Sequence, residues 1–201
     1  EGYYNQGSTP LVDGDYIQSR QLYLSTLGAN YFKDLSQNEL SQHVLREDPI
    51  SKNYSGNFKL SIPSIGLNNL PVKANVKSGD SNEYEEVLKT HIAHMDGTGL
   101  PISDINNNSV LYGHSARGDY FDQTQDVAGA FSRLQKLQIG DKITIEMEGK
   151  TYTYKVSKTK IVQPDDISIV NGVPNERTLT LFTCFPNGNP AKRFVVVAKP
   201  E

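Results

Sequence analysis

A single cysteine occurs in the 201-residue chain, and the residues around it make it a candidate nucleophile. Cys184 ends an apolar, β-branched run at residues 178–184, and a loop rich in proline, glycine and asparagine follows at residues 186–190. Free cysteines are among the most buried residue types, so an inert core thiol is the plain alternative. A thiol at a strand end beside a loop, however, lies where reactive groups become accessible. The neighbouring residues decide between the two interpretations.

Histidine is the usual partner of a cysteine nucleophile, because it takes up and releases protons near neutral pH. His114 ends the run at residues 109–113 as Cys184 ends its own, so two strands can bring both side chains to one rim. A histidine that only bonds a loop carbonyl is the alternative there. His43 lies in a polar helical pattern and His91 in a segment without a strand pattern, which makes both weaker candidates.

A planar cation near the thiol is offered by Arg193, which begins the last strand pattern nine residues after Cys184. Its guanidinium suits a carbonyl or a developing oxyanion. Successive residues of a strand point to opposite faces, so Lys192 and Arg193 cannot both serve one site, and the guanidinium has the better geometry. A solvated charge that discourages edge pairing is the alternative for either residue.

Short alternating runs of apolar and polar residues dominate the chain after Gly56, and they predict the strands that position these side chains. Seven or eight strands with few helices predict a mainly β fold, a closed or nearly closed barrel. Strands are expected at residues 58–62, 70–76, 109–113, 143–147, 152–156, 178–184 and 193–199, with short helical turns near 83–88 and 129–134.

The first 55 residues have a different pattern. Residues 1–12 are polar and turn-rich, which predicts a flexible lead-in. Apolar spacing predicts a helix at residues 15–27, and the capping-box pattern at residues 36–39 predicts a second helix that Pro49 ends. The chain is therefore expected to divide into a lead-in with a helical arm at residues 1–55 and a catalytic β-barrel domain at residues 56–201.

Composition and charge exclude several classes of function. The formal net charge is −3, and the charged residues form no long runs of either sign. This pattern argues against nucleic-acid partners, and it offers no basic segment that would bind an anionic membrane surface. One cysteine cannot form an internal disulfide. No apolar stretch approaches the roughly 18 residues of a membrane span, so any anchor is expected outside this sequence. The acidic pairs at 85–86 and 165–166 are expected to be solvated, so neither a metal nor an organic cofactor is predicted.

The residues around the three candidates carry a family resemblance. The segment TLFTC at residues 180–184 matches the T-L-x-T-C motif of the sortases, the cysteine transpeptidases of Gram-positive cell surfaces. Residues 112–114 (YGH) resemble the histidine motif of that family, and residues 193–196 (RFVV) resemble its arginine-bearing strand. Residues 58–72 resemble the pair of strands that opens the sortase barrel. The resemblance extends from about Phe58 to the C-terminus.

Within the family, the chain most resembles class C, the pilin-polymerising sortases, with class D as the alternative. Residues 94–101 (HMDGTGLP) are similar to the H-x-x-G-T-x-L-P segment of class C, and the C-x-P-x-G spacing from Cys184 is kept. Residues 191–194 (AKRF) also resemble class D. Class C members usually carry an Asp-Pro-aromatic lid, and the nearest match here is Asp48-Pro49-Ile50, which lacks the aromatic residue.

The resemblance implies a sortase-like closed barrel and a role for each candidate. Cys184 would cleave an LPxTG-like sorting signal between Thr and Gly through a thioester, His114 would act as general acid and base, and Arg193 would hold the signal or its oxyanion. The acceptor would be an amine of a pilin lysine or of a lipid-linked peptidoglycan precursor. The site would lie on the extracellular face of a Gram-positive membrane. Peptide-binding residues are expected to include Thr98, Leu100, Thr183 and Pro186.

Three other functions fit parts of the pattern. An L,D-transpeptidase also uses His, Cys and Arg on a β-rich fold, but its cysteine lies in an S-x-G-C context that this chain lacks. In a papain-like peptidase the cysteine precedes the histidine, whereas here His114 precedes Cys184. A surface binding module with Cys184 in its core is the non-catalytic alternative.

Overall fold

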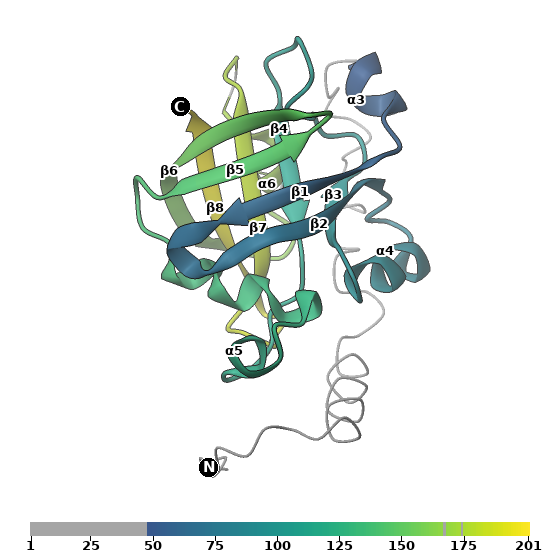
Figure 1. Ribbon diagram of the computed structural model, residues 1–201. Helices are drawn as coiled ribbons and strands as arrows, with labels where there is room; N and C mark the ends of the chain where they lie inside the picture. The colour runs from purple at the N-terminus through teal and green to yellow at the C-terminus, as the bar shows by residue number, and fades with distance from the viewer. Residues whose placement is uncertain (1–47, 167, 174) are drawn as a thin grey trace.

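The computed structural model describes residues 48–201 except 167 and 174, and this part of the chain forms a closed eight-stranded barrel (Figure 1). The strand order around the barrel is β1-β2-β3-β4-β7-β8-β6-β5, and β5 pairs with β1 to close it. The predicted mainly β barrel is thereby confirmed. The strands are β1 (Asn57–Ile62), β2 (Leu67–Val76), β3 (Ile92–Met95), β4 (Asn108–Tyr112), β5 (Lys142–Met147), β6 (Lys150–Val162), β7 (Thr178–Phe185) and β8 (Lys192–Pro200).

The barrel interior is built from the alternating strands that the sequence predicts. In β1 every second side chain is buried, and Leu60 and Ile62 have no exposed surface. In β5 the inward positions are Ile143, Ile145 and Met147. Burying one such side chain contributes about 1.5–3 kcal/mol, so register in these strands is set by which face turns inward.

Strands β3, β4 and β7 are buried on both faces, and β3 was not predicted. All four residues of β3 and all five of β4 are buried. Helix α4 (Ser81–Leu88) packs Tyr84 and Leu88 against the apolar cluster that includes Met95, and α6 (Ser168–Asn171) packs on β4 and β7. A strand covered on both faces has no alternating pattern, so the β3 sequence IAHM carries none of the expected signal.

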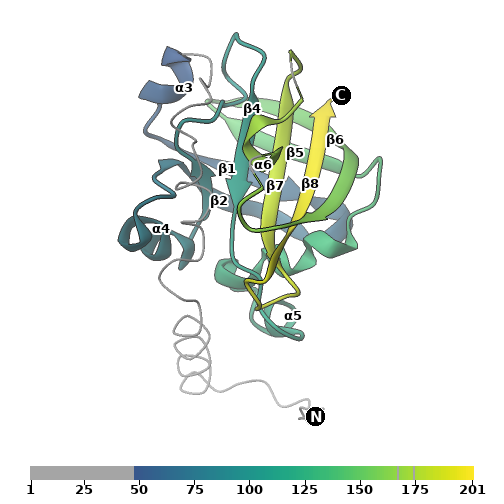
Figure 2. The ribbon, with the colours of Figure 1, turned by 180° about the vertical axis from the view of Figure 1, so that it is seen from behind.

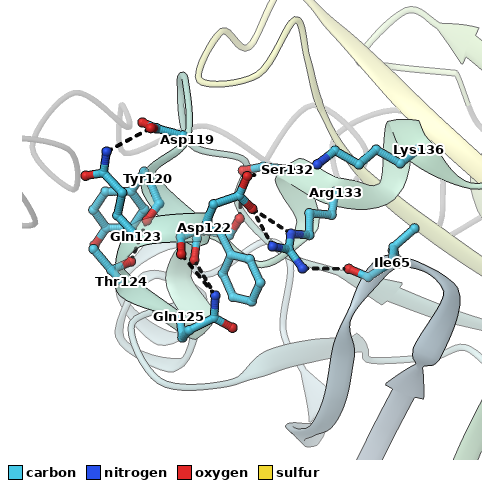
Figure 3. A network of polar contacts seen from close by, with 12 residues as sticks. Ile65, Asp119, Tyr120, Asp122, Gln123, Thr124, Gln125, Ser132, Arg133 and Lys136 are labelled. Atoms are coloured by element: carbon cyan, nitrogen blue, oxygen red, sulfur yellow. Dashed lines mark hydrogen bonds and ion pairs between the residues drawn. The ribbon is translucent and has the colours of Figure 1, made fainter. Parts of the chain in front are cut away.

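Short helices and an ion pair close one end of the barrel. Figure 3 shows the guanidinium of Arg133 between Asp122 and the carbonyl oxygen of Ile65, at 2.8 Å from each through Nε and Nη1 respectively. Arg133 also lies over the ring of Phe121. One side chain thus joins three helical turns. These turns belong to α5 (Tyr120–Thr124), η1 (Pro63–Ile65) and η3 (Phe131–Lys136), and η2 (Val127–Gly129) lies between α5 and η3.

The first described residues fasten α3 (Pro49–Asn53) to the barrel. Asp48 caps α3 by accepting from the backbone N–H of Ser51, and its carboxylate also accepts from Asn107 at 2.6 Å. The Ser51 hydroxyl accepts from the backbone N–H of Leu100. Pro49, predicted to end a helix, begins α3, because proline lacks the N–H that a first helical residue leaves unused.

Helix α3 lies far from the end of the barrel that α5 closes. Figure 2 shows α3 and α5 at opposite ends, with β4 running between them. The helices predicted at residues 15–27 and 36–48 fall outside the described residues, apart from Asp48, and the division at residue 55 stays a prediction. Within the described part of the chain, no helix has both the length and the apolar character that crossing a bilayer requires.

Candidate active site

Parallel strands β4 and β7 bring His114 and Cys184 to the same end of the barrel. Tyr112 pairs with Phe182 in this ladder, and His114 and Cys184 each come two residues later. The Thr183 hydroxyl donates to the Gly113 carbonyl at 2.7 Å, which continues the contact between the two segments past the last paired residues. The predicted meeting of the two strand ends is therefore what the structure contains.

Arg193 lies directly across from Cys184 on the antiparallel strand β8. Its Nη1 is 3.1 Å from the Cys184 sulfur and also donates to the carbonyl oxygens of Pro190 and Lys192. Arg193 is 1% exposed, whereas Lys192 faces solvent, as strand alternation predicted. A guanidinium at this distance in a buried site stabilises negative charge on sulfur, so Cys184 is placed to react as a thiolate.

The imidazole of His114 is buried and bonded to an acidic side chain of α4. Its Nε2 lies 3.1 Å from Oε2 of Glu85, whose side chain is 22% exposed. Glu85 and Glu86 were both predicted to be solvated; Glu86 does pair with Lys89 at the surface, but Glu85 faces the site. The buried positions Tyr84 and Leu88 identify the inner face of α4, but nothing in the sequence pairs Glu85 with a residue 29 positions later.

Ser115, which was not among the predicted site residues, fixes the loop after Cys184. Its hydroxyl donates to the carbonyl oxygen of Cys184 at 3.0 Å and accepts from the backbone N–H of Gly188 at 3.2 Å. Gly188 has a positive φ of 69°, and a Cβ there would lie 2.5 Å from a side-chain carbon of Arg117. The backbone around the thiol is thus held by one buried hydroxyl and a turn that favours glycine.

Of the four predicted peptide-binding residues, the structure brings two to the thiol. Thr183 precedes Cys184 and is fully buried, and Pro186 is exposed in the loop that follows. Thr98 and Leu100 are buried after β3, and the backbone N–H of Gly99 donates to the carbonyl of Asn108, which begins β4. They therefore lie toward the opposite end of β4 from His114. Peptide contacts by all four stay a prediction.

The segment at residues 94–101 is organised by the buried ring of His94. Its Nδ1 accepts from the backbone N–H of Asn75 at 3.1 Å, so Nε2 carries the proton and donates to the Gly99 carbonyl at 2.9 Å. The Thr98 hydroxyl donates to the Met95 carbonyl and lies 3.0 Å from Nε2. Burial disfavours the charged ring and lowers the pKa of His94 from 6.5 to about 4. His94 is therefore a neutral structural group.

Metal ligands are not grouped in the described residues. In residues 48–201 without 167 and 174, no three His, Cys, Asp or Glu side chains come together in a way that could hold an ion.

Comparisons with known proteins agree with this geometry. The Sortase domain family model matches residues 60–201. Sortase D of Bacillus subtilis is 31% identical over 198 residues, covering 96% of this chain and 89% of that protein. A pilus-related sortase C of Group B Streptococcus is similar in structure with a TM-score of 0.60 and 27% identity, over 94% of this chain and 91% of that one.

A second similar structure is sortase C of Clostridium perfringens with the C-terminal cell wall sorting motif. It has a TM-score of 0.57 at 22% identity, over 95% of this chain and 91% of that one, and it supports the fold. The predicted closeness to classes C and D is borne out by these relatives. The L,D-transpeptidase and the non-catalytic surface module are set aside by the family match. The chain belongs to the sortase family of cysteine transpeptidases.

Proposed function

We propose that this sortase cleaves an LPxTG-like sorting signal between Thr and Gly and transfers the threonyl acyl group to an amine. The single observation that carries the proposal is the contact of Arg193 Nη1 with the Cys184 sulfur at 3.1 Å, with His114 following the neighbouring parallel strand. A nucleophile, a proton carrier and a fixed cation are the parts that acyl transfer needs.

The reaction proceeds in two halves. The Cys184 thiolate attacks the carbonyl carbon of the threonine, and the oxygen becomes an oxyanion near Arg193. Collapse breaks the Thr–Gly bond, and His114 as imidazolium gives a proton to the departing glycine amine. In the second half an amine attacks the thioester, His114 takes up its proton, and the thiolate leaves. After the first half Cys184 is a thioester and His114 is neutral, and the second half restores the thiolate and the imidazolium.

Access to the thiol requires movement. Cys184 has no exposed surface and His114 is 1% exposed, whereas Pro186, Pro190 and Ala191 in the adjoining loop are exposed. Substrate binding therefore involves displacement of side chains or of this loop, which lies next to both Cys184 and Arg193. Lid-like steps of this kind are common in enzymes that must keep water from a reactive intermediate, here the thioester.

The acceptor amine belongs to a pilin lysine or to a lipid-linked peptidoglycan precursor, which are the acceptors that the class C and class D resemblance implies. The sorting-signal substrate is supported by the C. perfringens sortase C, whose structure was determined with such a motif. Sortases are enzymes of Gram-positive cell surfaces, and we infer that this one acts at the extracellular face of the membrane as a membrane-anchored enzyme.

The test is ligation of a panel of LPxTG-like peptides to lysine-containing and glycine-type amines, with products identified by mass spectrometry. Wild-type protein is expected to form an acyl-enzyme of the mass of the cleaved peptide and then the ligated product. Cys184→Ala removes the nucleophile and only a small volume, so it should retain its melting temperature and lose both species. Ligated product from Cys184→Ala, or no product from the wild type with any peptide, would overturn the proposal.

A further inference from the structure

Glu85 contacts His114 in the described active site, and no catalytic role follows for it from the sequence motifs. The two side chains meet through Oε2 and Nε2 at 3.1 Å, a separation within the ordinary range of an N–H···O hydrogen bond. The other carboxylate oxygen of Glu85 is buried and has no hydrogen-bond partner among the described residues. The hydrogen-bonding capacity of this carboxylate is therefore directed chiefly at His114.

Helix α4 holds Glu85 in place. Asp80 caps the helix by accepting from the backbone N–H groups of Asn82 and Glu83. Tyr84, next to Glu85, is fully buried and meets the ring of Tyr112 edge-on at 6.5 Å between centroids. Since Tyr112 ends β4 two residues before His114, the same contact that anchors α4 sets the distance from Glu85 to the imidazole.

Charge balance in the buried site favours an acid at this position. In the reactive state the site holds a Cys184 thiolate, a His114 imidazolium and the Arg193 guanidinium, with a sum of +1. Uncompensated buried charge is strongly unfavourable. The Glu85 carboxylate brings the sum to zero and lies against the member of the set that must change its charge during the reaction.

We propose that Glu85 is a positioning residue that orients His114 and stabilises its charged form for proton transfer at Cys184. The inference rests on the function proposed above. With Nε2 donating to Glu85 throughout, the proton that moves to the leaving amine and back from the attacking amine is the one at Nδ1. Glu85 itself keeps its charge and exchanges no proton, which distinguishes it from the catalytic residues.

Two substitutions on one helix turn separate this role from a general effect of α4. Glu85→Gln keeps the shape and a hydrogen-bond acceptor but removes the charge. Glu86→Gln makes the same change on the neighbouring residue, whose pairing with Lys89 is at the surface. The measurements are kcat and KM for the best peptide, the melting temperature, and the ring ¹⁵N signals of His114 in protein labelled with ¹⁵N-histidine.

The expected result is a kcat lower by about tenfold or more for Glu85→Gln, with KM nearly unchanged, because positioned acid–base groups contribute about 10²–10⁴-fold and part of that depends on orientation. The His114 ring signals should move in Glu85→Gln and stay in place in Glu86→Gln. An active wild type with equal kcat in Glu85→Gln overturns the inference and leaves the proposed function intact. If the wild type forms no product at all, the function fails, and unchanged ring signals in Glu85→Gln then overturn the pairing itself.

Discussion

The buried neutral ring of His94 makes the stability of the barrel depend on pH. In the folded chain Nδ1 accepts from the Asn75 backbone and Nε2 donates to Gly99, and burial lowers the pKa of His94 from 6.5 to about 4. Protonation would turn the Nδ1 acceptor into a donor facing another donor. Since the unfolded chain binds the proton more readily, stability is complete above pH 6.5 and declines as pH falls toward 4.

The size of the effect follows from the two pKa values. A separation of about 2.5 units corresponds to roughly 3 kcal/mol in full, at about 1.4 kcal/mol per unit. Between pH 7.5 and pH 5 the unfolded histidine becomes almost fully charged while the folded one stays mostly neutral, so about 2 kcal/mol of that total is lost in this interval. This loss is a large part of the stability of an ordinary domain.

Urea unfolding of the wild type and of His94→Gln at pH 7.5 and pH 5 measures this loss of unfolding free energy. Glutamine does not titrate, so the free energy of unfolding of the wild type should fall by about 2 kcal/mol more than that of the variant over the same interval. Groups common to both proteins cancel in this comparison. His91→Gln is the control, because His91 is only half-buried and should differ less from the wild type. An equal fall in wild type and His94→Gln would refute a neutral His94.

Two further predictions concern Arg193 and the buried side chain of Asn108, which has four hydrogen bonds. Arg193→Lys should lower kcat/KM for the peptide on the order of 100-fold, because an ammonium lacks the planar fork, while the exposed Lys192→Ala should have little effect; equal defects would contradict the opposite-face argument. Asn108→Ala should lower the free energy of unfolding, measured with urea, by about 3 kcal/mol. The Asn108 side chain donates to the carbonyl oxygens of Ile169 and Val170, and it accepts from the hydroxyls of Thr178 and Thr180. Asn106 is exposed and has one hydrogen bond, so Asn106→Ala should change the free energy of unfolding by less than about 0.5 kcal/mol. Similar losses in the two variants would show that the buried hydrogen bonds of Asn108 do not account for its effect on stability.

The positions of the three candidate catalytic residues were predictable because they follow from local patterns. A buried strand that gives way to a loop places the residues at its end at the end of the barrel, which holds for Cys184, the next-to-last residue of β7, and for His114, two residues past β4. Alternation likewise chose Arg193 over Lys192. These inferences need only the side-chain alternation of a strand and the position of a turn, and a few consecutive residues determine both.

Residues that depend on the packing of distant segments were not predictable in this way. Strand β3 was missed because helix α4 covers its outer face, and only the folded chain shows that α4 lies there. Glu85 was missed because its contact with His114 also depends on where α4 packs. The neighbouring Glu86 has the same side chain and faces solvent, so residue type alone does not distinguish the two.

The motif at residues 94–101 carries a family resemblance, and it also has a structural role that the sequence does not reveal. Thr98 and Leu100 stay predicted peptide contacts, and in the structure His94 and Thr98 form hydrogen bonds to the backbone of Asn75, Gly99 and Met95. The same segment receives α3 through the bond from Leu100 to Ser51. A polar motif near the candidate catalytic residues can therefore stabilise the fold through hydrogen bonds to the backbone. A substitution in the motif separates this role from peptide binding, because a structural residue changes the free energy of unfolding and a peptide-binding residue changes KM. For His94 the expected answer is stability, with a pH dependence that no surface contact would produce.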